Sequence, residues 1–198
     1  MIPIQNVYYM LSYAFQVLNE QGYKNIATEQ FHNTGELMAA ILEKGIAIQL
    51  KRGLGKEYIP QTEELSSLRG KIDIAESIKT QSMLRKQLIC TYDEFSVNST
   101  MNRIIKSTAA LLLRSNISKQ RKKNLRKLMM YFGEVDFIDL HTVNWNVQYN
   151  RNNQTYRMLI SVCYLVVKGL LQTQSDGSTQ LMDFLDEQRM CRLYEKFI

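Results

Sequence analysis

The spacing of apolar residues predicts that most of the chain is helical. In residues 5–19, apolar side chains recur at intervals of three and four, as they do on one face of a helix. The same spacing recurs in three further stretches, 34–48, 101–114 and 156–171. Asn33 followed by Glu36 resembles a capping box that opens the second of these helices. Gly45, a poor helix former, indicates where that helix bends or ends.

Residues 49–95 show a different pattern, in which apolar and polar residues tend to alternate. Alternating runs, the first at 71–74, predict short strands, and the Arg69-Gly70 pair before that run predicts a turn. Pro60 lacks an amide hydrogen, so the extended stretch around it is expected at a sheet edge or in an arm. We therefore predict an α+β fold, a mostly helical domain with a small antiparallel β-element at about residues 49–95.

Composition and cysteine use indicate a folded, reduced protein. The chain has 198 residues, 45% hydrophobic and 22% charged, with two prolines, which is typical of a globular protein. The longest apolar stretch, Met158–Val167, is too short for a bilayer, which needs about 18 apolar residues. Cys90, Cys163 and Cys191 lie in apolar surroundings without metal-site spacing, so free thiols are expected. We therefore expect a cytoplasmic protein with no membrane contact.

Four carboxylates are candidates for a magnesium-dependent nuclease site, namely Asp73, Glu76, Asp93 and Glu94. A PD-(D/E)xK nuclease needs one acid, and then a second acid and a lysine two residues apart. The carboxylates hold the metal, and the lysine steadies the attacking water. None of the four acids is followed by a lysine at that spacing. We therefore predict no catalytic residue and no metal ligand in this chain.

Residues 114–127 carry seven positive charges and no acid. Such a cluster can neutralise DNA phosphates and bind duplex DNA in a salt-dependent way, and the net charge of +6 is compatible with an anionic partner. The candidate DNA-binding residues are Lys119, Arg121, Lys122, Lys123, Arg126 and Lys127. The alternative is a solvent-exposed helix face, because apolar residues at helical spacing follow the cluster. The small number of aromatic residues argues against the stacking of single-stranded bases.

Several sequence blocks occur in an order that resembles a known family. They are IPIQNVYYMLSYAF (2–15), the pairs Arg52-Gly53 and Arg69-Gly70, the second within RGKIDIAESI, CTYDEFSVNSTMNRIIKSTAALLL (90–113), NRNNQTYRMLISVCYLVV (150–167) and CRLYEKFI (191–198). In number and order the blocks resemble the N-terminal region of the McrC family. McrC is the partner subunit of the McrBC methylcytosine-dependent restriction system. No block is a catalytic signature, so the resemblance rests on the whole set.

The resemblance implies a domain layout. McrC-like proteins continue into a second domain that carries a PD-(D/E)xK nuclease, whereas this sequence ends within an amphipathic pattern. We expect a GTPase-ring-binding domain at 1–172 with the β-element inserted, a linker at 173–180, and the start of the nuclease domain at 181–198. The chain is then expected to be truncated before the nuclease domain, as a fragment, a shortened gene product or one half of a split gene.

The resemblance also implies a role. McrC-like proteins bind a hexamer of McrB-like AAA+ GTPase subunits and stimulate GTP hydrolysis, and the complex cuts DNA near methylated cytosine. The β-element is our candidate for the arm that enters the ring, and its expected partner-binding cations are Arg52, Lys56, Arg69 and Lys71. No cofactor is expected in this chain, since GTP and Mg²⁺ would belong to the ring and Mg²⁺ to the nuclease domain. The alternatives are a DNA-binding module using residues 114–127 and a non-functional truncated remnant.

Overall fold

The structure is a computed structural model that describes residues 4–15, 18, 23–149 and 154–173. The predicted linker beyond residue 173, the segment 181–198 and Cys191 lie outside the described residues. The elements, in order, are α1 (Ile4–Ala14), α2 (Lys24–Thr28), α3 (Thr34–Arg52), β1 (Glu57–Leu65), β2 (Lys71–Ile72), α4 (Ile74–Lys79), the 3₁₀ helix η2 (Ser82–Arg85), β3 (Leu88–Ser96), α5 (Thr100–Arg114), α6 (Lys119–Met129), the 3₁₀ helix η3 (Met130–Phe132) and α7 (Gln154–Thr173).

The chain divides into two compact units. The helical unit comprises the residues up to Leu54 and those from Thr100 onward, and the β unit comprises Gly55–Ser99. The β unit is therefore inserted, in sequence, between α3 and α5. The structure confirms the predicted fold class, a mostly helical chain with a small antiparallel sheet.

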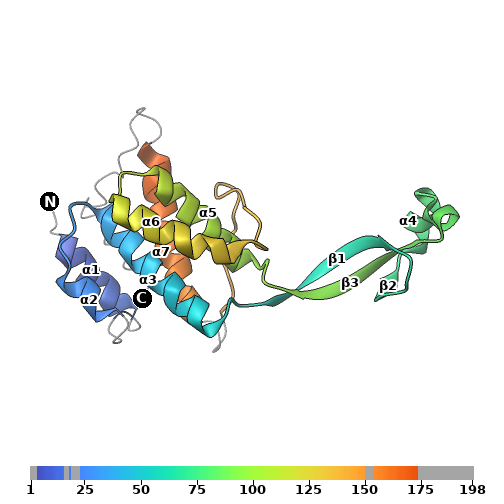
Figure 1. Cartoon of the computed structure of the whole chain (residues 1–198), viewed down its shortest axis with the longest axis horizontal. Coiled ribbons are helices and arrows are strands. Elements are labelled where there is room, and N and C mark those ends of the chain that lie inside the picture. The colour runs from blue at the N-terminus through green and yellow to red at the C-terminus, as the bar shows by residue number, and fades with distance from the viewer. Residues whose placement is uncertain (1–3, 16–17, 19–22, 150–153, 174–198) are drawn as a thin grey trace. The chain divides into compact units, whose positions relative to one another are not determined.

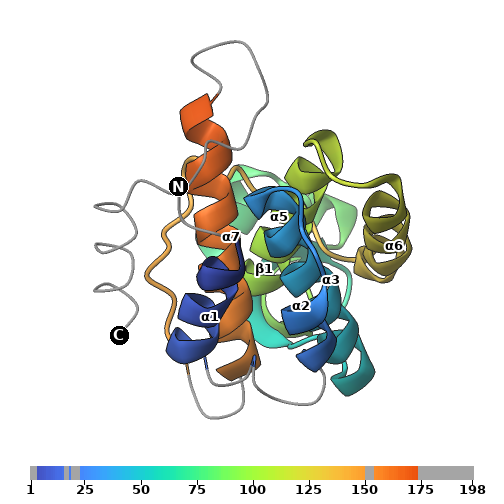
Figure 2. The same cartoon turned by 90° about the vertical axis from the view of Figure 1, so that its left-hand side faces the viewer.

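Helices α3 and α5 form the centre of the helical unit, and both contact α6 and α7 (Figure 2). Leu37 and Ile41 of α3, Ile104 of α5 and Leu159 of α7 are completely buried where these helices meet. Burial of such side chains stabilises a fold by about 1.5–3 kcal/mol each. The helical spacing predicted these helices because the apolar residues at that spacing are the ones buried between the helices.

Polar side chains of α5 fasten the neighbouring segments. The Tyr156 hydroxyl of α7 donates a hydrogen bond to Asn102 Oδ1 at 2.7 Å, and both residues are buried. Lys106 donates to the carbonyl oxygens of Phe132 and Val135, which follow α6. Buried polar groups require partners of this kind, because leaving them unpaired costs free energy. The α5 helix therefore orders both α7 and the chain that leaves α6.

The expectation that the helix ends at Gly45 is wrong. Helix α3 continues to Arg52. Gly45 instead lies where α7 comes closest, and a Cβ atom there would overlap Leu159 and approach the Tyr23 hydroxyl. The helix ends at Gly53, which has a φ of +91° that other residues rarely adopt. The glycine within the helix therefore allows close packing, and the later glycine terminates the helix.

The β unit contains a three-stranded antiparallel sheet with the order β1-β3-β2 (Figure 1). Strands β1 and β3 pair over nine positions, from Glu57 opposite Ser96 to Leu65 opposite Leu88. Pro60 lies in β1, an edge strand, as its missing amide hydrogen predicted. The strands thus begin later than the predicted start at residue 49, because α3 occupies residues 49–52.

The segment after β2 is helical, although sequence alternation predicted a strand there. Strand β2 is limited to Lys71–Ile72, and α4 begins directly after Asp73. The Asp73 carboxylate accepts a hydrogen bond from the Glu76 amide at 3.0 Å, which caps the helix. This local bond competes with strand pairing and explains why alternation over four residues did not give a longer strand.

Two further features are the apolar character of the helices and the state of the cysteines. Within the described residues, no helix has both the length and the apolar character needed to cross a bilayer. Cys90 and Cys163 are buried free thiols. Burial in apolar surroundings raises the pKa of Cys163 to about 12, so this thiol stays protonated and unreactive in the folded chain.

The contrast between Gly45 and Gly133 can be measured. We expect Gly45→Ala to lower the free energy of unfolding by about 1–2 kcal/mol, because overpacking against Leu159 outweighs the helix propensity of alanine. Gly133 has a φ of −56° and its added Cβ would meet only the Met130 carbonyl oxygen at 4.0 Å. We expect Gly133→Ala to raise stability by about 0.4–1 kcal/mol. Urea unfolding measures both, and a gain of stability in both variants would contradict the packing account.

Candidate partner-binding site

The Arg69-Gly70 pair forms a turn that is fixed against β3. The Arg69 guanidinium lies 3.8 Å from the centre of the Tyr92 ring, which is a cation–π contact. Gly70 has a φ of +66°, and a side chain there would overlap the Thr91 carbonyl oxygen. The Tyr92 hydroxyl donates to Glu63 at 2.9 Å, and this hydrogen bond raises the pKa of Tyr92. The contact with Tyr92 therefore holds Arg69 in place, and the close approach of the turn to β3 requires glycine at position 70.

The four predicted partner-binding cations are divided between the two units. Arg52 lies in the last turn of α3, within the helical unit, and donates to Thr155 Oγ1 at 3.1 Å. Lys56 directly precedes β1, at the end of the sheet where the chain arrives from α3. Arg69 and Lys71 lie together beside the middle of β3. Arg69 and Lys71 are thus the pair that the fold brings together in the β unit.

The end segment, residues 66–87, connects β1 to β3 and carries a set of exposed apolar side chains. Five large apolar residues in it are between 47% and 80% exposed: Leu68, Ile74, Ile78, Met83 and Leu84. Helix α4 and η2 lie at the end of the sheet where β3 begins (Figure 1). Several exposed large apolar side chains within one short segment indicate a candidate interaction site.

Sequence reasoning missed this apolar group, although a signal for it was present. Asp73 and Glu76 have the spacing of a helix start, which would have placed Ile74 and Ile78 on one face of a short helix. In the structure Asp73 caps α4, and Glu76 pairs with Lys79 at 3.2 Å. Among the described residues, no group of three His, Cys, Asp or Glu side chains could hold a metal ion.

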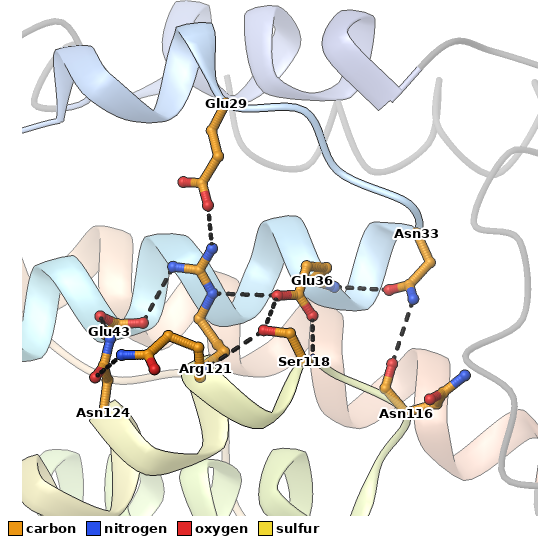
Figure 3. Close-up of polar contacts among 9 residues, drawn as sticks. Glu29, Asn33, Glu36, Glu43, Asn116, Ser118, Arg121 and Asn124 are labelled. Carbon is orange, nitrogen blue, oxygen red and sulfur yellow. Dashed lines mark hydrogen bonds and ion pairs between the residues drawn. The ribbon is translucent and has the colours of Figure 1, made fainter.

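Residues 119–127 of the basic segment lie in helix α6, and one of their cations points inward. The Arg121 guanidinium contacts three carboxylates from the chain around α3, as Figure 3 shows. Its partners are Glu29 at 2.6 Å, Glu43 at 3.1 Å and Glu36 at 3.4 Å. The side chain of Arg121 is 12% exposed. Arg121 therefore ties α6 to α3, and the guanidinium is occupied within the helical unit.

One of these carboxylates, Glu36, also stabilises the start of α6. Glu36 accepts hydrogen bonds from the Ser118 amide at 2.8 Å and from the Ser118 hydroxyl at 2.7 Å (Figure 3). Ser118 in turn accepts from the Arg121 amide and caps the helix. The first turn of α6 contains no acid of its own. Glu36 supplies from α3 the negative charge that the positive end of the helix dipole favours.

The electrostatics of Arg121 follow from this arrangement. Burial by itself lowers the pKa of Arg121, but the hydrogen bond to Glu43 and the charge of Glu29 outweigh it. The pKa of Arg121 is therefore raised above its ordinary value, and the side chain stays charged at every physiological pH. The other predicted DNA-binding residues of α6, namely Lys119, Lys122, Lys123, Arg126 and Lys127, are half-buried or exposed.

We expect Arg121→Met to lower the free energy of unfolding by about 2–3 kcal/mol. Removing one member of a buried ion pair costs about 3–5 kcal/mol, and the partial exposure of Glu29 and Glu43 reduces that cost. The control is Lys123→Met, an exposed position of the same helix, which should change stability by less than about 0.5 kcal/mol. Chemical denaturation measures both. Equal effects of the two variants would show that the three carboxylates do not depend on Arg121.

Comparison with solved structures shows where the fold recurs. A chain of the cryo-EM structure of the Thermococcus gammatolerans McrBC complex matches with a TM-score of 0.61 and 23% identity, over 82% of this chain and 50% of that one. A refined half-complex of a tetradecameric assembly of T. gammatolerans McrB AAA+ hexamers with bound McrC matches with a TM-score of 0.58 and 21% identity, over 79% and 40% of the two chains. At these identities the matches establish the fold.

Comparison of sequences establishes the family. The chain is 31% identical, over 206 aligned positions, to the Escherichia coli K12 protein named type IV methyl-directed restriction enzyme EcoKMcrBC. The alignment covers the whole of this chain and 58% of the E. coli protein. The family model described as McrBC 5-methylcytosine restriction system component matches residues 4–198. The chain therefore belongs to the family of McrBC 5-methylcytosine restriction system components.

Proposed function

We propose that this chain is a McrC-like component that docks on a hexameric AAA+ GTPase ring through its β unit and stimulates GTP hydrolysis. The observation that carries the proposal is the exposed apolar group of the end segment. Membership in the McrBC family supports a ring partner. The similarity in fold to chains of McrBC complexes, one of which contains McrB AAA+ hexamers with bound McrC, supports it as well.

The apolar side chains of the end segment suit a tight contact with a protein. Leu84 and Ile78 are 80% and 62% exposed, and burying such a side chain in an interface contributes up to about 1.5–3 kcal/mol. Ile78 lies in α4, which is anchored to β3 by a hydrogen bond from the Ile89 amide to Ser77 Oγ at 2.9 Å. Leu84 lies in the 3₁₀ helix η2, which is joined to α4 by a hydrogen bond from the Ser82 hydroxyl to the Ser77 carbonyl oxygen at 3.3 Å. The end segment is thus ordered before it meets a partner, which reduces the entropy lost on binding.

Cations in the same segment give this apolar group a charge preference. Arg85 is held by Glu64 through two hydrogen bonds of 2.9 Å, whereas Lys71 and Lys86 are exposed. A partner with acidic groups around an apolar recess would complement such a surface. In this proposal the cations bias a nucleotide-site element of the ring toward its active arrangement, which is an allosteric coupling between two sites. GTP and Mg²⁺ are bound by the ring.

DNA cleavage near methylated cytosine is, in this proposal, an activity of the assembled complex. The chain spans 58% of the length of its E. coli relative. Of the four candidate carboxylates, Asp73 caps α4 and Glu76 pairs with Lys79. A cytoplasmic location fits both a DNA substrate and the reduced thiols of Cys90 and Cys163.

The proposal predicts how variants of the end segment change GTP turnover by the cognate ring. We expect the full chain to stimulate turnover several-fold. The double variant Ile78→Ser, Leu84→Ser should raise the concentration needed for half-maximal stimulation at least about tenfold, because it removes apolar contacts worth at least about 1.4 kcal/mol. Both residues are exposed, so the variant should melt at the same temperature as the original chain.

The matched control is Met130→Ser, Tyr131→Ser, which removes two equally exposed apolar side chains from the helical unit. It should leave the half-maximal concentration within about twofold, since only apolar groups that become buried contribute to affinity. Co-migration of the chain with the ring in size-exclusion chromatography provides a second readout. A chain that neither co-migrates nor stimulates would overturn the proposal, and equal losses in the two double variants would overturn the assignment to the end segment.

A further inference from the structure

Helix α6 carries a continuous basic stripe on the face that points away from the core. The stripe consists of Lys119, Lys122, Lys123, Arg126 and Lys127. These positions follow the spacing i, i+3, i+4, i+7 and i+8, which places them on one face of a helix. Arg121 and Leu125 occupy the opposite face, where Leu125 is completely buried and Arg121 binds its three carboxylates. The structure thus separates one structural cation from five outward ones.

The positive charge of the basic stripe is not neutralised within the described part of the chain. No ion pair there joins any of its five side chains to a carboxylate. The sequence contains no acid between Arg114 and Gly133, so no residue of α6 itself can form an ion pair with the stripe. The acids that lie near α6, Glu29, Glu36 and Glu43, are engaged with Arg121 on the inner face.

This charge pattern opposes the stability of the helix that carries it. Like charges four residues apart, such as Lys119 with Lys123 and Lys123 with Lys127, repel each other. Cations in the first turn also oppose the helix dipole. The Ser118 cap, the Glu36 carboxylate and Arg121 offset these terms from the inner side. Because α6 is anchored on its inner face, its outer face can carry this repulsion between like charges. A polyanion bound to the outer face would reduce the repulsion.

We propose that the basic stripe of α6 binds the phosphate backbone of duplex DNA, independently of the ring-docking function of the β unit. The stripe contains no apolar residue between Lys119 and Lys127 on its face, whereas the centre of a protein interface is apolar and poor in lysine. No aromatic ring lies among the five cations, so the stacking platform for a single strand is missing. Lysine and arginine contacts to phosphate do not read bases, and the binding is therefore independent of sequence and of methylation.

The geometry sets the scale of the contact. From Lys119 to Lys127 the helix rises about 12 Å, along which a duplex presents several phosphates. Five cations on this length would make about three to five phosphate contacts. Each contact releases a counterion, so the slope of log K against log salt is expected between about −2.7 and −4.5.

The test is fluorescence anisotropy of the full chain with a labelled, unmethylated duplex of about 20 base pairs, titrated with salt. We expect binding at about 50 mM salt that weakens with the slope given above. The triple variant Lys119→Gln, Lys123→Gln, Lys127→Gln should bind at least tenfold more weakly at that salt concentration, and its slope should fall by about 2.7, since each phosphate contact contributes about 0.9. Relief of the like-charge repulsion should leave its melting temperature equal or higher.

The matched control is Lys44→Gln, Lys51→Gln, Lys168→Gln, which removes the same charge from exposed positions of α3 and α7. It should keep at least half of the affinity and the original slope. Equal losses in the two triple variants would reduce the effect to net charge and overturn the proposal. No binding at about 50 mM salt, or tighter binding of a single strand of the same length, would overturn it as well.

Discussion

The ion cluster around Arg121 is the interaction on which the position of α6 in the helical unit depends. One guanidinium joins Glu29, Glu36 and Glu43, and Glu36 also holds the start of α6 through Ser118. Apolar burial alone would fix α6 weakly, because Leu125 is the one buried residue within the helix. The cluster therefore lets a helix with an unfavourable charge pattern pack firmly on α3. Both proposed surfaces rely on such anchoring, since each presents its side chains from an element that is already ordered.

The β unit follows a related principle with different chemistry. A long ladder between β1 and β3 carries the end segment, and the local cap at Asp73 turns the chain into α4. The sheet buries little, because Cys90 and Tyr92 are the buried residues of β3. Apolar residues that could have formed a core lie instead on the surface of the end segment. Such an arrangement is unfavourable in isolation and becomes favourable in contact with a partner.

Much of the fold could be predicted because its determinants are local. Helical spacing identified α3, α5 and α7, and Asn33 caps α3 as predicted, through the Glu36 amide at 2.7 Å. Two features could not be predicted because distant contacts decide them. In the sequence Gly45 is a poor helix former, and only the structure shows that Leu159 lies against it. Arg121 resembles the other cations of α6 in the sequence, but in the structure it contacts glutamates of a distant segment. The end segment could be predicted only in part. The spacing of Asp73 and Glu76 indicates a short helix with Ile74 and Ile78 on one face, but sequence alone does not tell an exposed isoleucine from a buried one.

The central claim is that the β unit, and its end segment in particular, is where the chain meets the GTPase ring. Hydrogen exchange of the full chain, with and without the cognate ring, tests it most directly, because amide protection reports which backbone segments become covered. We predict slower exchange in residues 66–87 on addition of the ring and unchanged exchange in α6. Protection confined to the helical unit, with residues 66–87 unchanged, would contradict the account.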